Sequence, residues 1–212
     1  MEALKGCDLI AAEDTRVTAK LLASLGIKKT LIPFHAHSPK SALRYLVRQL
    51  QEGATIALVS DAGSPPVSDP GAELVDVAYE AGVQIDAIPG PSAVVNALAL
   101  AGFRAQRFVF LGFLPKKMGQ AERILEQFKE FGGALVLFEN PHRVLKVLQL
   151  VQKILGERRV ALCREMTKKF QEVIRGWISE VLASSLYLKG EVTLVIEENR
   201  NPPSSSGSAR SL

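Results

Sequence analysis

A loop rich in glycine, proline, serine and aspartate is the strongest candidate for a binding site in this sequence. It reads S-D-A-G-S-P-P-V-S-D-P-G at residues 60–71 and directly follows the apolar run Ile56–Val59. Asp61 could accept hydrogen bonds from an ammonium group or a ribose hydroxyl, and Gly63 leaves room for a ligand against the backbone. Asp61 could equally make a turn, and Asp69 is better explained as a helix cap. We predict that this loop forms half of a small-molecule site.

A second candidate loop, P-G-P-S-A at residues 89–93, also separates an apolar run from a helical pattern. Backbone N–H groups at the start of a helix favour anionic parts of a ligand, although Ser92 could simply cap that helix. Neither loop has the G-x-G-x-x-G of a dinucleotide fingerprint or the G-K-[ST] of a P-loop. Two such loops after two strands of one sheet favour a ligand site at the edge where those strands end.

Charged residues also follow the first two apolar runs. Glu13, Asp14 and Arg16 (E-D-T-R) could orient a substrate or take a proton, or could start a helix with an ordinary ion pair. His35 lies at a predicted strand end, where it could contact a substrate. Because H-A-H at 35–37 has no matching cluster of ligands, we expect no metal site there.

Two further turns combine acidic and basic side chains: F-E-N-P-H-R at residues 138–143 and R-E-M-T-K-K at residues 164–169. The first contains Glu139 and Arg143, and a capped helix with a surface ion pair would explain it as well as a functional site. The second contains Lys168 and could be solvated surface or a contact to a phosphate.

The composition is that of an ordinary globular enzyme: 212 residues, 47% apolar, with a net charge of +4. Its two cysteines, Cys7 and Cys163, are too few for a disulfide framework. No apolar run approaches the ~20 residues of a membrane helix, and M-E-A-L-K-G-C-D is not a secretory signal. We therefore expect a cytoplasmic protein. Its mild basic balance is compatible with an RNA partner without requiring one.

The apolar pattern predicts strands that alternate with helices, which is typical of a mostly parallel sheet. In the first half we expect strands at 8–12, 30–34, 56–59 and 83–88 and helices at 15–25, 39–52, 70–81 and 92–101. In the second half we expect strands at 108–113, 134–138, 159–163, 170–175 and 191–197, and helices at 120–131 and 144–155.

The predicted fold class is therefore α/β, with two domains. An N-terminal domain at 1–113 has a mostly parallel sheet with helices on both faces, and an α/β domain with a mixed sheet follows at 114–198. We place the boundary near F-L-P-K-K at 113–117, and we expect the serine-rich tail at 199–212 to be disordered.

Seven motifs in order resemble one family over residues 4–198. They are A-A-E-D-T-R, V-S-D-A-G-S-P-P-V-S-D-P-G, P-G-P-S-A, G-F-L-P, F-E-N-P-H-R, L-C-R-E-M-T-K and K-G-E-V. The chain resembles the small-subunit ribosomal RNA methyltransferases of the tetrapyrrole (corrin/porphyrin) methylase superfamily. That resemblance implies a homodimer of two-domain chains with S-adenosylmethionine bound between the domains. It also implies 2′-O-methylation of a cytidine in the decoding centre of 16S rRNA.

The resemblance also implies roles for individual residues. Catalysis would involve Asp14, His35 and Lys168, and RNA contacts would involve Glu13, Arg16 and Arg143. Cofactor contacts would involve Asp61, Gly63, Ser64, Val67, Gly90, Ser92, Ala93, Phe138 and Glu139.

The sequence departs from the family pattern at its start. The family opens with a strand that ends in a P-T-P-I-G-N-L type loop, and this sequence begins only a few residues before A-A-E-D-T-R. We therefore expect an N-terminally truncated chain whose first domain lacks its first strand. Two alternatives stay open: a methylase that acts on a small molecule such as a tetrapyrrole precursor, and an inactive truncated binding module.

Overall fold

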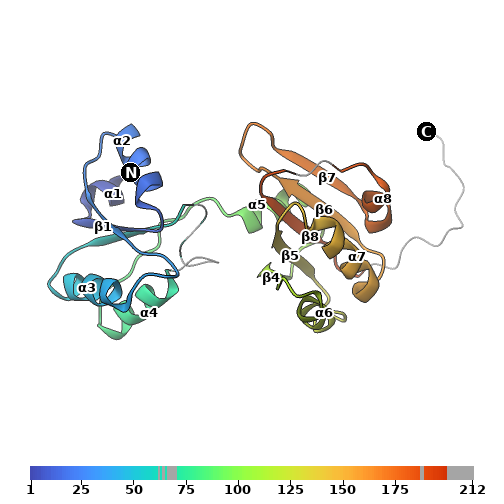
Figure 1. Ribbon diagram of the computed structural model, residues 1–212, viewed down its shortest axis with the longest axis horizontal. Coiled ribbons are helices and arrows are strands. Elements are labelled where there is room, and N and C mark those ends of the chain that lie inside the picture. The colour runs from blue at the N-terminus through green and yellow to red at the C-terminus, as the bar shows by residue number, and fades with distance from the viewer. Residues whose placement is uncertain (62, 64, 66–70, 187–188, 200–212) are drawn as a thin grey trace, which may run out of the picture. The chain divides into compact units, whose positions relative to one another are not determined.

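The computed structural model describes residues 1–61, 63, 65, 71–186 and 189–199 (Figure 1). The chain forms two compact units, Met1–Ser92 and Ala93–Leu212. Each unit is built around its own β-sheet, so each is described by itself.

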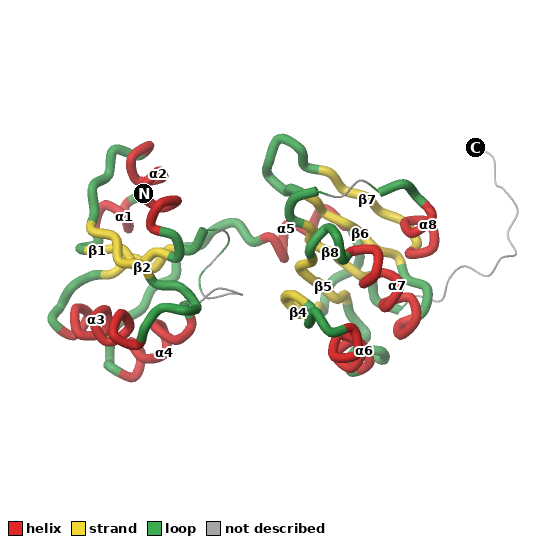
Figure 2. Tube along the Cα trace, viewed as in Figure 1, coloured by secondary structure: helices red, strands yellow, loops and turns green. Residues whose placement is uncertain are grey.

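The sheet of the first unit, sheet A, contains three parallel strands in the order β2-β1-β3. The strands are β1 (Leu9–Ala12), β2 (Thr30–Pro33) and β3 (Ile56–Val59), and β1 is buried along its whole length. Helices cover both faces (Figures 1 and 2), because successive residues of β1 point to opposite sides. The four helices are α1 (Glu2–Gly6), α2 (Thr15–Ser24), α3 (Lys40–Gln51) and α4 (Ala72–Glu80).

The two faces of sheet A bury separate apolar clusters. Ile10 and Ala12 pack with Leu22 of α2 on one face. Leu9 and Ala11 pack on the other face, where Leu46 of α3 and Leu74 of α4 cover them.

The sheet of the second unit, sheet B, contains five strands in the order β4-β5-β8-β6-β7. Only the β4–β5 pairing is parallel, and the other pairings are antiparallel. The larger core lies on the face covered by α6, α7 and α8, and α5 packs on the opposite face. The strands are β4 (Phe108–Phe113), β5 (Ala134–Glu139), β6 (Arg159–Arg164), β7 (Glu172–Trp177) and β8 (Val192–Ile196), and the helices are α5 (Ala93–Ala101), α6 (Met118–Glu126), α7 (Val144–Leu155) and α8 (Ile178–Ala183).

The α/β fold class, with a parallel first sheet and a mixed second sheet, is confirmed. The strand predicted at 83–88 is wrong, because those residues belong to no strand and Ile88 is 68% exposed. Alternating apolar and polar residues form a strand only when a sheet edge pairs with them. The short helices α1 and α8 were not predicted, since one or two turns leave too little periodic signal.

The two units divide between Ser92 and Ala93, whereas the sequence placed a boundary at 113–117. Residues 93–113 belong with sheet B because α5 packs against β6 and β8, and β4 pairs with β5. The boundary that the sequence analysis placed near Leu114 therefore lies inside the second unit. Of the tail predicted to be disordered, residues 200–212 lie outside the described residues.

Candidate functional site

The candidate residues of the first unit gather where the strands of sheet A end. Ala12 pairs with Pro33 on one side and with Val59 on the other, so the three strands end together. The residues that follow them, at 13–16, 34–35 and 60–61, form what we call the sheet A edge. Ligands of open parallel sheets bind at such an edge. The motifs that begin at Glu13, Phe34 and Ser60 therefore share one edge of sheet A within the first unit.

A carboxylate links two of these motifs. Oε2 of Glu13 accepts a hydrogen bond from the backbone N–H of Asp61 at 3.1 Å. The backbone N–H of Glu13 in turn donates to the carbonyl of Val59 at 3.1 Å. Glu13 therefore fixes the start of the glycine- and proline-rich loop against the end of β1.

Asp14 caps α2 and binds Arg16. Its Oδ1 accepts from the backbone N–H of Arg16 at 2.8 Å and from its Nε at 3.1 Å, while Oδ2 accepts from Nη2 at 2.6 Å. These bonds hold the pKa of the Asp14 carboxyl well below its usual range. The side chain of Arg16 remains 87% exposed. Asp14 is therefore an ionised hydrogen-bond acceptor at neutral pH and a poor proton carrier.

His35 follows Phe34, whose buried ring anchors the end of β2. The backbone N–H of His35 donates to Oγ of Ser38 at 2.8 Å, and its Nδ1 accepts from the backbone N–H of His37 at 3.2 Å. With Nδ1 as an acceptor, the neutral ring carries its proton on Nε2. The exposed imidazole therefore offers a donor at this edge.

Gly63 adopts a φ of +84°, which favours glycine, and a Cβ placed there would meet nothing within 4 Å. The glycine therefore serves the backbone turn and leaves open space beside it. Ser64 and Val67, the other cofactor residues predicted in this loop, lie outside the described residues.

The P-G-P-S-A loop does not follow a strand of sheet A, because the residues before it, 83–88, form no strand. Gly90 is exposed in an irregular segment, and Ser92 and Ala93 lie on either side of the division between the units. The φ of Gly90 is not positive, so its conformation does not require glycine.

The candidate residues of the second unit also gather at one edge. Glu139 ends β5 and Arg164 ends β6, the two strands that flank β8, and each residue pairs with Val192 at the start of β8. The sheet B edge, as we define it, comprises residues 113–115, 139–143, 164–171 and 189–191. It therefore brings together the G-F-L-P, E-N-P-H-R, R-E-M-T-K and K-G-E motifs.

Glu139 and Arg143 are held inside this edge. Nη1 and Nη2 of Arg143 donate to the carbonyls of Leu114 and Pro115 at 3.1 and 2.8 Å, and Nη1 lies 3.4 Å from Oε1 of Glu139. The guanidinium is thus engaged within the protein. Oε1 of Glu139 also accepts from the N–H of Asn140 at 2.8 Å. Among the described residues, the buried Oε2 of Glu139 has no hydrogen-bond partner.

Phe138 belongs to an aromatic cluster beside Glu139. Its ring lies 4.7 Å from that of Phe110 and 5.6 Å from that of Phe113, in edge-to-face arrangements. Phe113 is 63% exposed. The cluster therefore offers an apolar surface at the end of β4 and β5.

Lys168 lies between two carboxylates. Its Nζ is 3.1 Å from Oε1 of Glu165 and 3.0 Å from Oε2 of Glu191. These contacts raise the pKa of the Lys168 ammonium, so the amine stays protonated and is poorly suited to remove a proton.

Comparison with known proteins identifies the family. The family model described as Tetrapyrrole (Corrin/Porphyrin) Methylases matches residues 1–182. The chain belongs to this family. It is also 43% identical to ribosomal RNA small subunit methyltransferase I of Halalkalibacterium halodurans, over 92% of this chain and 68% of that protein. The protein of the same name from Thermotoga maritima is 41% identical, with 92% of this chain and 89% of that protein covered.

Solved structures support the fold of this tetrapyrrole methylase. The crystal structure of the methyltransferase CobJ matches with a TM-score of 0.67 and 18% identity, covering 95% of this chain and 88% of that one. At that identity the likeness concerns the fold alone.

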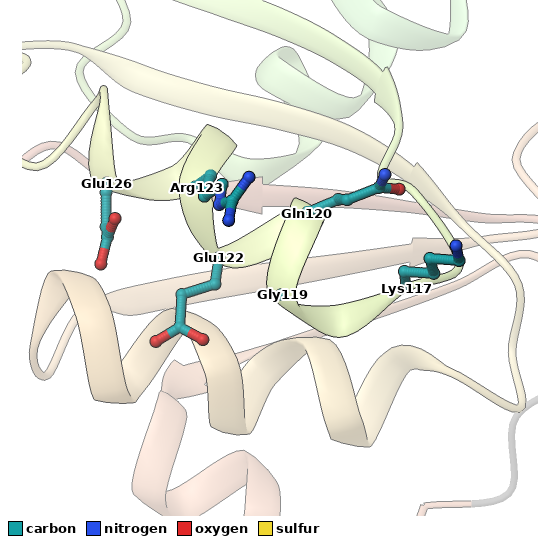
Figure 3. A pocket seen from close by; sticks show the side chains of 6 residues that line it. All are labelled: Lys117, Gly119, Gln120, Glu122, Arg123 and Glu126. Atoms are coloured by element: carbon teal, nitrogen blue, oxygen red, sulfur yellow. The ribbon is translucent and has the colours of Figure 1, made fainter.

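Two surface hollows of this methylase lie away from both edges. One, of about 600 Å³, is lined by Lys117 and side chains of α6, which Figure 3 shows spread along the helix without converging. The other, of about 450 Å³, lies between the end of α2 and β2. Neither contains a predicted site residue. Within the described ranges, no helix of this methylase is long and apolar enough to cross a bilayer.

Several residues that organise the sheet B edge were missed from the sequence. Glu165, Gly190 and Glu191 surround Lys168, and Glu165 also accepts from the N–H of Glu191 at 2.8 Å. Their motifs were recognised, but nothing in the sequence indicated that they meet. A glycine between two charged residues was the one signal that could have drawn attention to this turn.

Proposed function

We propose that this chain transfers a methyl group from S-adenosylmethionine to ribosomal RNA, at the 2′-hydroxyl of a cytidine in the decoding region of 16S rRNA. The observation that carries the proposal is its 40–43% identity with proteins named ribosomal RNA small subunit methyltransferase I over more than nine-tenths of the chain. The grouping of the matching motifs at one edge of each sheet supports it, because both edges offer polar groups for a ligand.

The residues of the sheet A edge fit the proposed cofactor. Glu13, Asp14 and Asp61 bring carboxylates to one edge, which suits the ammonium, sulfonium and ribose hydroxyl groups of S-adenosylmethionine. Gly63 keeps the adjoining backbone open. When bound, this cofactor supplies an activated methyl group on a positively charged sulfur. Asp61 would accept hydrogen bonds from it, and the full proposed contact set is Asp61, Gly63, Ser64, Val67, Gly90, Ser92, Ala93, Phe138 and Glu139.

The protein must align the ribose hydroxyl with the methyl group, and this alignment is the main source of catalysis in such a transfer. Asp14 would accept the hydrogen bond of the 2′-hydroxyl, since a carboxylate has about four lone-pair sites and Arg16 occupies three. The proton that the hydroxyl loses on methylation would pass to water, because Asp14 stays ionised. His35 would donate from Nε2 to the same nucleotide. The exposed Arg16 would contact a backbone phosphate. We also propose a homodimer in the cytoplasm, and sedimentation velocity tests the dimer.

Methyl transfer from radiolabelled S-adenosylmethionine tests this function directly. We expect label in small ribosomal subunits, recovered after nuclease digestion as 2′-O-methylcytidine, and none in porphyrinoids. Label on a base would overturn the ribose assignment, and label only in porphyrinoids would establish the small-molecule alternative. Cofactor binding without any transfer would support an inactive binding module.

Asp61→Ala tests the cofactor site. We expect calorimetry to show about a ten-fold weaker affinity for S-adenosylmethionine, the effect of losing roughly one charge-assisted hydrogen bond. Asp76→Ala, which removes an exposed carboxylate from α4, should bind as the wild type does. Equal affinities for the two variants would return Asp61 to a purely turn-forming role.

A further inference from the structure

The connection between β6 and β7, residues 165–171, presents an exposed aromatic ring at the sheet B edge. Figure 1 shows this connection extending past the ends of the two strands. Phe170 is 66% exposed, and Nζ of Lys169 lies 5.6 Å from the centre of its ring. A cation over an aromatic face is an attractive arrangement. A ring of this size left in water is a candidate contact for a partner.

The backbone of this connection is strongly constrained. Glu165 and Thr167 have φ values of 47° and 66°, and they are the non-glycine residues with positive φ among those the structure describes. Such conformations persist where surrounding contacts impose them. Oε1 of Gln171 accepts from the N–H of Thr167 at 2.7 Å, and the N–H of Lys168 donates to the carbonyl of Glu165 at 3.0 Å.

Contacts to the residues just before β8 also fix the position of this connection. The N–H of Glu165 donates to the carbonyl of Glu191 at 3.0 Å, and Lys168 bridges the carboxylates of both residues. Gly190 packs so closely against the side chain of Glu165 that an added Cβ would collide with its carboxylate. By pairing with both carboxylates, Lys168 therefore fixes the turn that contains Lys169 and Phe170.

The chemistry of the exposed ring favours a nucleic acid over an apolar protein surface. The other apolar side chain of the connection, Met166, packs into the core under α5. Within the connection, Phe170 is thus an exposed ring among the polar residues Thr167, Lys168, Lys169 and Gln171. Unpaired bases stack on single aromatic rings, with lysines nearby to contact the phosphates.

We propose that Phe170 and Lys169 form a stacking platform for an unpaired base of the RNA substrate, and that Lys168 is a positioning residue that holds this platform. The proposal rests on the proposed function, since it assigns a further RNA contact to the same enzyme. A rigid platform loses little conformational entropy when the base binds.

Binding of a fluorescent single-stranded RNA, measured by anisotropy, tests the platform without requiring activity. We expect Phe170→Ala to weaken binding about ten-fold, within the range for loss of one stacked base, and Phe170→Trp to retain it. Phe108→Ala removes another exposed ring, 43% accessible at the start of β4, and should bind as the wild type does. The affinity for S-adenosylmethionine should be unchanged in all three variants.

Lys168→Met tests the positioning role. We expect it to weaken RNA binding as much as Phe170→Ala, and the double variant to be no weaker, because both changes remove the same contact. In assays with small ribosomal subunits, Phe170→Ala should raise KM with little change in kcat.

Wild-type affinity for RNA in Phe170→Ala would overturn the platform. A changed sedimentation coefficient with unchanged RNA affinity would show a protein contact instead, and would also overturn it. Failure of the proposed function is distinct from both results, because wild-type protein would then transfer no methyl group to ribosomal RNA.

Discussion

The arginines of the two sheet edges, Arg16 and Arg143, are held by contacts of different range. At the sheet A edge, Asp14 is bound by Arg16, two residues away. At the sheet B edge, Arg143 reaches the carbonyls of Leu114 and Pro115, 29 and 28 residues earlier. Glu165 likewise accepts from the N–H of Glu191, 26 residues later. The pairing of Asp14 with Arg16 depends on a local turn, although Glu13 at the same edge accepts from Asp61, 48 residues later. The contacts of Arg143 and of Glu165 with Glu191 depend on the assembled sheet.

The solvent exposure of these ion-paired side chains also differs between the two edges. Arg16 is 87% exposed, while the side chain of Glu139 at the other edge is fully buried. Water screens the first ion pair and can replace it, but a buried carboxylate that loses its partner has no substitute. We therefore expect substitution of Arg143 to act on stability, and substitution of Arg16 to act mainly on ligands.

Arg143→Ala should produce the largest loss of stability. It removes two hydrogen bonds to carbonyls and the cation beside buried Glu139, so we expect the free energy of unfolding to fall by about 3 kcal/mol. Urea denaturation measures this change. Lys153→Ala breaks a largely exposed ion pair to Glu122 and should cost under ~1 kcal/mol. Similar losses in both variants would remove the contrast between buried and exposed pairs.

Gly190→Ala should have the next largest effect. The residue has a φ of +83°, and the new Cβ would collide with Glu165, so we expect a loss of about 2 kcal/mol. Gly119→Ala is the matched control, because Gly119 lies in α6 with nothing within 4 Å of an added Cβ. That change should stabilise the helix by roughly 0.5–1 kcal/mol. A neutral result at Gly190 would mean that Glu165 and its turn relax freely.

Asp14→Ala should have the smallest effect on stability, and that effect should depend on pH. The pKa of Asp14 is lower in the folded protein than the value of about 3.9 in an unfolded chain. Its contribution is therefore present at neutral pH and lost as pH falls through the folded pKa. Melting temperatures of wild type and variant should differ at pH 7, and the difference should begin to shrink as the pH falls below about 4, toward the lower folded pKa. A difference that is constant with pH would show that the carboxylate charge is not responsible.

Local sequence patterns, such as apolar runs and helix caps, predicted much of this fold. The β1 run L-I-A-A, the cap at Asp14 and the apolar faces of α3 and α7 are local features, and the structure contains them close to the predicted bounds. The segment at 83–88 has the same alternation as a real strand, but no sheet edge pairs with it. Its failure shows that alternation describes what a segment could do, while pairing depends on another part of the chain.

The sequence by itself determined the α/β class, most of the elements and the motifs that tie the chain to the tetrapyrrole methylases, because these depend on residue type and spacing along the chain. Tertiary structure alone decided the contacts of Arg143 with Leu114 and Pro115, the contact of Lys168 with Glu191, and the inclusion of α5 and β4 in the second unit. These outcomes depend on contacts between distant segments. Such contacts form only when the sheet brings Leu114, Glu165 and Glu191 beside their partners, and no local pattern records that geometry.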